Sequence, residues 1–242
     1  MTVPGPHQPV PTSTPSQHAA AGGMRRGAST GEPATFVVVR HGRTAGTEAG
    51  LWTGGTKPGP GLSSGGRIDA ARAADLVARI GRDRWADLPR VSEILASPTV
   101  RTQETAAAIG RRLGLHVATE PDLREVDLGA WDGLTCEQID ALVPGAVRTW
   151  HAEGTLVAPD GESPAEVAER IDALLARLVA GREGRAAVLV GHTIVVRSVV
   201  ASVLGLPASS ISRVRIPPGG VVVVRRWADG VGELVASGVV PG

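Results

Sequence analysis

The chain has 242 residues, enough for one large domain or two small ones, and its 42% of apolar residues can build a sizeable core. A formal net charge of +1 without a dense run of Lys or Arg gives no reason to expect a nucleic-acid or anionic-membrane partner. The single cysteine, Cys136, excludes an intramolecular disulfide framework and a zinc site built on cysteines.

The start of the chain reads differently from the rest. Residues 1–33 are rich in Pro, Ser, Thr, Gly and Ala and have no apolar period, which predicts a disordered tail before a folded region at 34–242. The first residues lack the charged and apolar regions of a signal peptide, and no apolar run approaches the ~18 residues of a membrane span. We therefore expect a cytoplasmic protein.

The stretch FVVVRHGRT, residues 36–44, ends a run of four apolar residues in a cluster of polar ones. Three of the four apolar residues are β-branched, a pattern typical of a short strand buried on both faces. In open α/β sheets, ligands bind beyond the carboxyl ends of the strands. We therefore expect Arg40 and His41 at the bottom of a pocket, with Gly42 letting the backbone approach its occupant. The alternative is a polar cluster that ends a strand and meets solvent.

Periodicity after this stretch predicts alternating helices and strands. Residues 45–66 are rich in Gly and Pro and are expected to form an irregular loop at the pocket mouth. Further strands are predicted at 94–96, at 187–190 and within 214–235. Helices are predicted at 70–80 and at 193–204. Another is expected to run to about 113, with Ser97 as N-cap and Pro98 as first residue. Two more should follow the capping boxes Thr135/Gln138 and Ser163/Glu166. This order favours a three-layer α/β fold, a mostly parallel central sheet with helices on both faces.

Polar groups of a few kinds follow the predicted strands. Five of these groups follow strand ends, namely Arg40, His41, Ser97, Arg101 and His192. Glu125 lies in the acid-rich segment between the predicted strands at 94–96 and 187–190. Parallel strands would bring these groups to one edge of the sheet, where arginines, histidines and helix N-termini suit a dianionic oxyanion such as phosphate. A neutral histidine nitrogen could attack phosphorus there, and a carboxyl group could protonate the leaving oxygen. The alternative for each histidine is an ordinary core or surface residue.

Five motifs occur in one order along the chain: RHGRT at 40–44, SPTVRTQETA at 97–106, LREVDLGAWDGLT at 123–135, GES at 161–163 and VGH at 190–192. In order and spacing these motifs resemble the histidine phosphatase superfamily, the phosphoglycerate mutase-like family, over about residues 35–206. The resemblance implies a histidine phosphatase domain at 34–242 with a phosphoglycerate mutase-like fold and a small cap insertion at about 134–162.

The resemblance also implies roles for individual residues. His41 would be the nucleophile that becomes phosphohistidine, Glu125 the proton donor, and Arg40, Arg101 and His192 the phosphate pocket, with no metal or other cofactor. Further substrate-binding candidates are Arg43, Thr47, Thr53, Gly54 and Thr193.

Four of these positions leave questions open. Thr47 stands where many members have asparagine and Thr193 where glycine is common, but neither change removes a catalytic group. Arg43 could contact substrate or form a surface ion pair with an acid. Asp127 is the other candidate acid beside Glu125, although a structural hydrogen bond suits it better.

We expect a phosphatase acting on a singly phosphorylated small molecule. A mutase must exclude water and hold a bisphosphorylated intermediate, and the segment between Gly133 and Gly161 offers only Arg148 and His151 as basic residues. The alternatives are mutase-type phosphotransfer and a phospho-ligand-binding module without turnover. The apolar strands at 214–224 could pair across a homodimer or within the chain.

Overall fold

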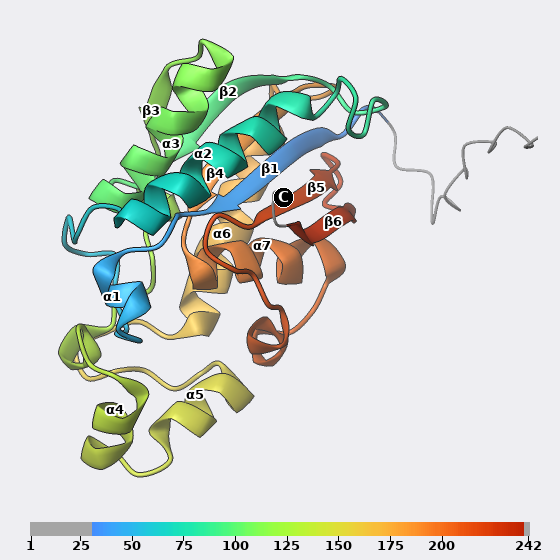
Figure 1. Ribbon diagram of the computed structural model, residues 1–242. Coiled ribbons are helices and arrows are strands. Elements are labelled where there is room, and N and C mark those ends of the chain that lie inside the picture. Colours follow the sequence, from blue (N-terminus) through green and yellow to red (C-terminus); the bar gives the residue numbers. More distant parts are fainter. Residues whose placement is uncertain (1–30, 240–242) are drawn as a thin grey trace, which may run out of the picture.

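A six-stranded sheet in the order β3-β2-β4-β1-β5-β6 forms the centre of the computed structural model, which describes residues 31–239 (Figure 1). Strands β3, β2, β4 and β1 pair in parallel, and β5 and β6 run antiparallel to their neighbours. The strands are β1 (Ala34–Arg40), β2 (Val91–Ala96), β3 (Val117–Thr119), β4 (Ala186–Gly191), β5 (Val221–Arg226) and β6 (Gly232–Val239). The mostly parallel sheet is confirmed, whereas residues 1–30 of the predicted tail lie outside the described residues.

Helices cover both faces of this sheet, which confirms the three-layer α/β prediction (Figure 1). One face carries α2 (Ser64–Arg79) and α3 (Val100–Leu113), and the other carries α6 (Pro164–Val179) and α7 (Thr193–Leu204). Both predicted capping boxes are present, one before α4 and one before α6. Short 3-10 turns complete the set: η1 (Pro121–Leu123), η2 (Gly129–Trp131) and η3 (Ala208–Arg213).

Each face of the sheet has its own hydrophobic core, which explains the unbroken apolar runs. Along β1, Phe36 and Val38 belong to the core shared with α6 and α7, whereas Val37 and Val39 belong to the core shared with α2 and α3. All four side chains are fully buried. Burying each one stabilises the fold by roughly 1.5–3 kcal/mol. A central strand covered on both faces therefore carries apolar residues at consecutive positions, and does not alternate apolar with polar ones.

Two further helices, α4 (Cys136–Leu142) and α5 (Ala146–Glu153), lie apart from the sheet at the lower end of the view in Figure 1. They occupy the segment where a cap insertion is expected. Trp150 of α5 packs against Trp52 and Trp131, with ring centroids 5.4 and 5.7 Å apart. These three tryptophans join α5 to the loop that follows the single-turn helix α1 (Ala45–Glu48).

Some element boundaries differ from the predictions. Helix α2 begins at Ser64, six residues early, because the Ser63 hydroxyl accepts a hydrogen bond from the Gly66 N–H. The assignment of Ser97 as the N-cap of α3 was wrong. Thr99 is the N-cap, and the Ser97 hydroxyl instead lies 2.8 Å from His192 Nε2. The strand β3 and the helices α1 and α5 are short, and the apolar periodicity of the sequence did not predict them.

Packing between elements requires a glycine at position 42. A Cβ at this position would collide with the Gly66 carbonyl at the start of α2, while the Gly42 N–H donates to Thr105 Oγ1 of α3 at 3.2 Å. The close approach that the structure shows is therefore between the end of β1 and two helices, and an approach to a bound molecule stays a prediction.

The C-terminal strands find partners within the chain. Strand β5 lies between β1 and β6, so the apolar run at 221–224 is covered intramolecularly. The homodimer stays a prediction. Among residues 31–239, no helix has both the length and the apolar character needed to cross a membrane.

The capping box of α6 makes a stability prediction. The Ser163 hydroxyl accepts from the Glu166 N–H at 3.2 Å and donates to the Glu166 carboxylate at 2.8 Å. We expect Ser163→Ala to lower the free energy of unfolding by about 1 kcal/mol, measured by urea denaturation. Ser64→Ala is the control, since Ser64 is exposed and we expect a change within ~0.5 kcal/mol. Equal losses in the two variants would contradict the capping role.

Candidate active site

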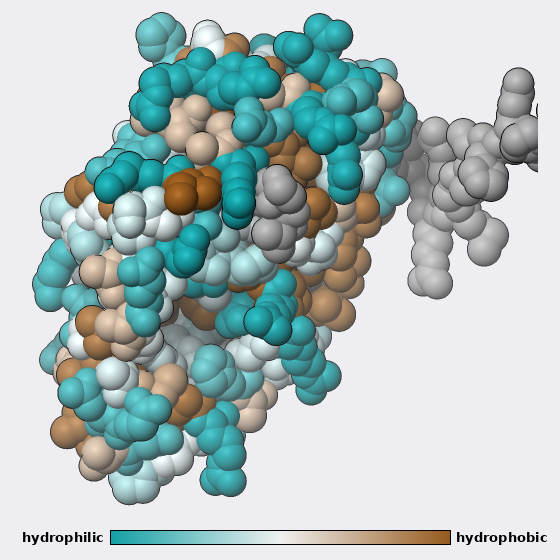
Figure 2. All heavy atoms as spheres, viewed as in Figure 1, coloured by the Kyte–Doolittle hydropathy of each residue, from teal (hydrophilic) through white to brown (hydrophobic). Residues whose placement is uncertain are grey.

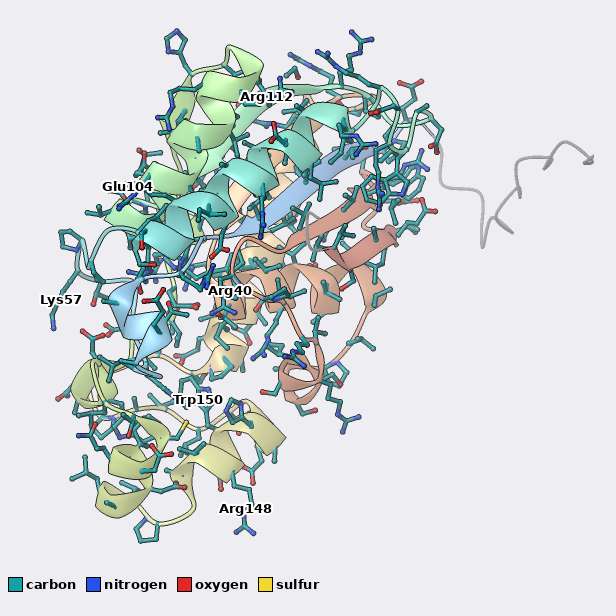
Figure 3. All side chains as sticks on the ribbon, viewed as in Figure 1. Arg40, Lys57, Glu104, Arg112, Arg148 and Trp150 are labelled. Atoms are coloured by element: carbon teal, nitrogen blue, oxygen red, sulfur yellow. The ribbon has the colours of Figure 1, made fainter. Side chains whose placement is uncertain are left out.

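A cavity of about 260 Å³ opens beyond the carboxyl ends of the central strands. Figure 2 shows the surface hollowed where the α4–α5 segment meets the body of the molecule. Arg40 lies on the inner side of this hollow and Trp150 of α5 faces it from below (Figure 3). Polar groups from β1, α3 and α7 form one part of the lining, and Leu51, Trp52 and Trp150 form an apolar wall.

His41 lies at the inner end of the cavity with only 6% of its surface exposed. Its Nδ1 is 2.7 Å from the carbonyl oxygen of Gly42. Because a carbonyl can only accept, Nδ1 carries the proton and Nε2 keeps a free lone pair. Burial, followed by the positive charge of Arg101, lowers the pKa of His41 to about 3. The ring is therefore neutral at pH 7, as a nucleophile must be.

Two arginines beside His41 are held by backbone carbonyls. Arg40 Nη1 donates to Ile216 O at 2.7 Å, and Arg101 Nη2 donates to Gly54 O at 2.9 Å. Three of their further donors, Arg40 Nε and Arg101 Nε and Nη1, are buried and have no partner among residues 31–239. Unpaired buried donors are costly, about 1–3 kcal/mol each, so a cluster of them marks a place built to receive an acceptor.

His192 adds a fourth donor to this cluster. Its ring centroid lies 5.2 Å from that of His41, and its Nε2 is 2.8 Å from the Ser97 hydroxyl. Burial lowers the pKa of His192 well below its usual value, so the ring is neutral. His192 Nδ1 is buried without a protein partner in the described part of the chain. A hydroxyl can either donate or accept, and in the tautomer in which Ser97 donates to Nε2 the proton is on Nδ1. Nδ1 can then donate to an oxyanion.

Glu125 supplies a carboxyl group at the same cavity. Its two oxygens accept hydrogen bonds from the backbone N–H groups of Val126 at 3.1 Å and Ile194 at 3.2 Å. Burial nevertheless raises the pKa of Glu125, against those bonds and the charges of Arg101 and Arg40. Since an ordinary glutamate has a pKa of about 4.3, this carboxyl group keeps its proton to higher pH and suits a general acid.

An ion pair positions the segment that carries Glu125. Arg170 of α6 pairs with Glu162 at 2.9 Å and donates to the Arg124 carbonyl at 3.0 Å. Asp127 accepts from the Gly129 N–H through its side chain, which is the structural alternative considered for it. Glu162, the central residue of the GES motif, therefore supports the acid and lies outside the cavity lining.

The structure brings most of the predicted residues together. Seven predicted residues line the cavity: Arg40, His41, Thr47, Thr53, Arg101, Glu125 and Thr193. His192 lies behind this lining with its ring against that of His41, and the Gly54 carbonyl accepts a hydrogen bond from Arg101. Arg43 is the exception, because its guanidinium pairs with Asp69 of α2 at 2.7 Å and does not line the cavity. Its position supports the ion-pair alternative and not a contact with substrate.

One charged residue of the lining was missed by the sequence analysis. Arg197 lies on α7 four residues after Thr193, and both face the cavity. An arginine inside an otherwise apolar helix, spaced one turn from a predicted site residue, is the signal that could have found it. His151 and Trp150 of α5 also line the cavity, as expected for a segment that covers the site.

Residues 31–239 contain no cluster of three or more His, Cys, Asp and Glu side chains that could hold a metal ion. The groups that converge on the cavity are instead hydrogen-bond donors, a neutral imidazole and a carboxyl group. This set is suited to binding and transferring a phosphoryl group.

Comparison with known proteins agrees with this geometry. The family model of the histidine phosphatase superfamily (branch 1) matches residues 36–238. The chain belongs to this superfamily. His41, Arg101, Glu125 and His192 all lie within the matched region, so the resemblance seen in the motifs is confirmed.

Relatives in the histidine phosphatase superfamily include two from Mycobacterium tuberculosis. Glucosyl-3-phosphoglycerate phosphatase is 34% identical over 183 residues, covering 72% of this chain and 77% of the relative. Bifunctional protein Rv2228c is 28% identical over 204 residues, covering 84% of this chain and 53% of the relative. The chain thus spans about half the length of the first curated relatives it matches.

A solved structure shows the same fold. Mycobacterial glucosyl-3-phosphoglycerate phosphatase Rv2419c, in a structure of its complexes with VO3, superposes with a TM-score of 0.72 and 29% sequence identity. The match covers 85% of this chain and 99% of that one. The phosphoglycerate mutase-like fold is therefore confirmed.

The donor cluster predicts how phosphate binding depends on Arg101. A lysine has its three N–H donors on one nitrogen, so it cannot reach the Gly54 carbonyl and also place donors where Arg101 Nε and Nη1 lie. We expect Arg101→Lys to weaken binding of inorganic phosphate roughly 10- to 100-fold, measured by isothermal titration calorimetry. Arg112→Lys, at an exposed position on the same helix, is the control and should bind as the wild type does. Equal affinity in the wild type and in Arg101→Lys would contradict the assignment.

Proposed function

We propose that this chain is a phosphatase that hydrolyses small-molecule phosphomonoesters through a phosphohistidine at His41. The observation that carries this proposal is the set of unpartnered buried donors on Arg40, Arg101 and His192 beside a neutral imidazole. Such donors can bind the non-bridging oxygens of a phosphate while His41 Nε2 faces phosphorus. They stabilise the charge that develops on those oxygens during transfer.

In the first step, His41 Nε2 attacks phosphorus. The Nε2–P bond forms as the bond from phosphorus to the ester oxygen breaks, and the Glu125 carboxyl group gives its proton to that leaving oxygen. The alcohol departs neutral. Glu125 is left as a carboxylate, stabilised by the backbone N–H groups of Val126 and Ile194.

In the second step, water attacks the phosphorus of the phosphohistidine. The Glu125 carboxylate accepts a proton from that water, the Nε2–P bond breaks, and inorganic phosphate forms. His41 returns to its neutral form with Nδ1 still donating to the Gly42 carbonyl. The protein finishes the cycle with Glu125 protonated again, so no external proton donor is consumed.

The cap favours hydrolysis over mutase-type transfer. A mutase would need cations around the cavity to hold a bisphosphorylated intermediate. His151 is the basic residue of α4 and α5 that lines the cavity, and burial lowers its pKa, so it is neutral at pH 7. Arg148 of α5 is exposed and points away from the cavity (Figure 3).

The substrate belongs among small phosphorylated metabolites. The cavity is small, and Trp52 and Trp150 give its outer part an apolar wall against which a carbon skeleton can pack. Because relatives are named for glucosyl-3-phosphoglycerate, that compound joins phosphoglycerates, sugar phosphates and α-ribazole phosphate in the set of substrates to test.

The test of this function is phosphate release by the wild type and by His41→Ala. With a panel of phosphomonoesters and EDTA present, we expect turnover by the wild type and a loss of at least about a thousandfold in the variant. Mass spectrometry at alkaline pH should detect a phosphoryl group on His41. His116→Ala, at an exposed histidine, should keep the wild-type rate.

Three outcomes would reject the proposal. Turnover retained in His41→Ala would assign the wrong nucleophile. A wild type that binds phosphate but turns over nothing on the panel would favour a phospho-ligand-binding module, and isomerisation of 3-phosphoglycerate dependent on 2,3-bisphosphoglycerate would favour a mutase.

The opposite pKa shifts of His41 and Glu125 predict the pH dependence. His41 must be neutral, so kcat/KM should fall only as the pH approaches about 3. Glu125 must be protonated, so kcat/KM should also fall as the pH rises through its raised pKa.

Glu125→Gln cannot ionise and should lack this alkaline decline, with a loss of roughly 10²- to 10⁴-fold on alkyl phosphates. On p-nitrophenyl phosphate, whose leaving group needs no proton, the loss should be smaller; equal losses on both would contradict the acid role.

A further inference from the structure

We propose that Ser97 is a positioning residue, which holds the ring of His192 in the tautomer that donates a hydrogen bond to the bound phosphate. This inference rests on the proposed function, because it assigns the donor that the phosphate meets at His192. Among the described residues, Ser97 does not line the cavity, so it acts through His192. Its basis is a hydrogen bond between two buried side chains and the unpaired nitrogen on the other side of the ring.

The Ser97 hydroxyl has a single hydrogen-bond partner within residues 31–239. That partner is His192 Nε2, at 2.8 Å. Both residues are 0% exposed, so bulk water does not supply either side chain with another partner. Burial lowers the pKa of His192 well below its usual value, and the neutral ring carries one proton. One ring nitrogen therefore donates and the other accepts.

The two tautomers of His192 differ in how many buried groups they leave unpaired. If Nε2 carried the proton, it would donate to Ser97, and both the hydroxyl hydrogen and the Nδ1 lone pair would lack a partner in the described part of the chain. If Ser97 donates to Nε2, only the Nδ1 N–H lacks a partner there. Because each unpaired buried polar group is costly, Ser97 favours the tautomer with the proton on Nδ1.

The same tautomer suits an anion at the site. The ring centroid of His192 lies 5.2 Å from that of His41, and after burial the charge of Arg101 is the next cause that lowers the pKa of His192. The ring therefore lies among the groups that are proposed to bind phosphate. A lone pair on Nδ1 would repel a phosphate oxygen, whereas an N–H group would donate to it and leave no polar atom of the ring unpaired.

The first turn of α3 holds the Ser97 backbone in place. The Ser97 carbonyl oxygen accepts from the Thr102 hydroxyl and from Gln103 Nε2, each at 2.8 Å. Arg101 precedes these two residues on the same turn of the helix. Ser97 therefore joins the turn that carries Arg101 to the ring of His192, and its hydroxyl orients one phosphate-binding group relative to the other.

The tautomer is tested directly by NMR on protein labelled with ¹⁵N in histidine. Long-range ¹H–¹⁵N correlation spectra distinguish a protonated ring nitrogen from an unprotonated one, and the signals of His192 are identified by their loss in His192→Asn. We expect the proton of His192 on Nδ1, both in the free protein and with inorganic phosphate bound. A proton on Nε2 in either state would overturn the proposal, whatever the stability of the variants below.

Phosphate binding tests the role of the hydroxyl. We expect Ser97→Ala to weaken binding of inorganic phosphate roughly 3- to 10-fold in isothermal titration calorimetry, because the ring loses the bond that selects its tautomer and orientation. In the ¹⁵N spectra of Ser97→Ala without phosphate, both tautomers of His192 should appear. Ser92→Ala, at an exposed position on the same strand, is the matched control and should match the wild type in both measurements.

A double-mutant cycle separates a role through His192 from a structural one. In a His192→Asn background there is no imidazole to orient, so Ser97→Ala should change phosphate affinity by less than about twofold. Equal losses from Ser97→Ala in the wild type and in His192→Asn would show that Ser97 only supports the fold, which overturns the proposal. Unchanged phosphate affinity in Ser97→Ala would overturn it as well.

Failure of this inference and failure of the proposed function are distinguishable. If the wild type hydrolyses phosphomonoesters but the proton of His192 lies on Nε2, the phosphatase function stands and the role of Ser97 falls. If the proton lies on Nδ1 and Ser97→Ala weakens phosphate binding, but the wild type hydrolyses no phosphomonoester, the proposed function falls and the role of Ser97 in binding phosphate stands.

Discussion

His41 and His192 leave the sheet side by side because β1 pairs with β4 in parallel. In the observed register Arg40 lies opposite Gly191, and the backbone N–H of His41 donates to the Gly191 carbonyl at 3.0 Å. The two imidazole rings then lie 5.2 Å apart between centroids. Both strands are buried on both faces, so a shift of register by one residue would exchange the two hydrophobic cores. The chemistry of the site therefore depends on the same packing that stabilises the fold.

Burial shifts the pKa values of His41 and Glu125 in opposite directions, and both shifts favour the proposed reaction. It disfavours charge on His41, which leaves a nucleophilic nitrogen, and it disfavours charge on Glu125, which leaves a transferable proton. The arginines strengthen the first effect and oppose the second, and burial prevails at Glu125. One environment of low polarity thus lowers the pKa of His41 and raises that of Glu125. Backbone hydrogen bonds fix the orientation of each group.

The cavity has two parts with different structural origins. Its inner part, around His41, is built from strand ends and from α3, elements that pack into the two cores. Its outer part comes from α5, the loop after α1 and one face of α7. Contacts among Trp52, Trp131 and Trp150 join α5 to that loop and to η2. The inner part suits any phosphate, and the outer part can discriminate between the molecules that carry it.

The sequence by itself determined the features that depend on neighbours along the chain. Both capping boxes join residues three apart, the apolar stripe of α6 repeats every three or four residues, and the run at 36–39 has the composition of a central strand. The site residues Arg40, His41, Arg101, Glu125 and His192 were predicted from motifs that are each a short run of consecutive residues. The tertiary structure alone decided which distant groups meet. Ser97 bonds to His192 across 95 residues of chain instead of capping α3, Arg43 pairs with Asp69, and Arg197 enters the cavity. Those outcomes depend on strand register and on the rotation of each helix about its axis, which are set by packing between elements. Local periodicity does not encode the partners of Ser97 and Arg43, and the one-turn spacing of Arg197 from Thr193 points to the cavity only once Thr193 is placed there.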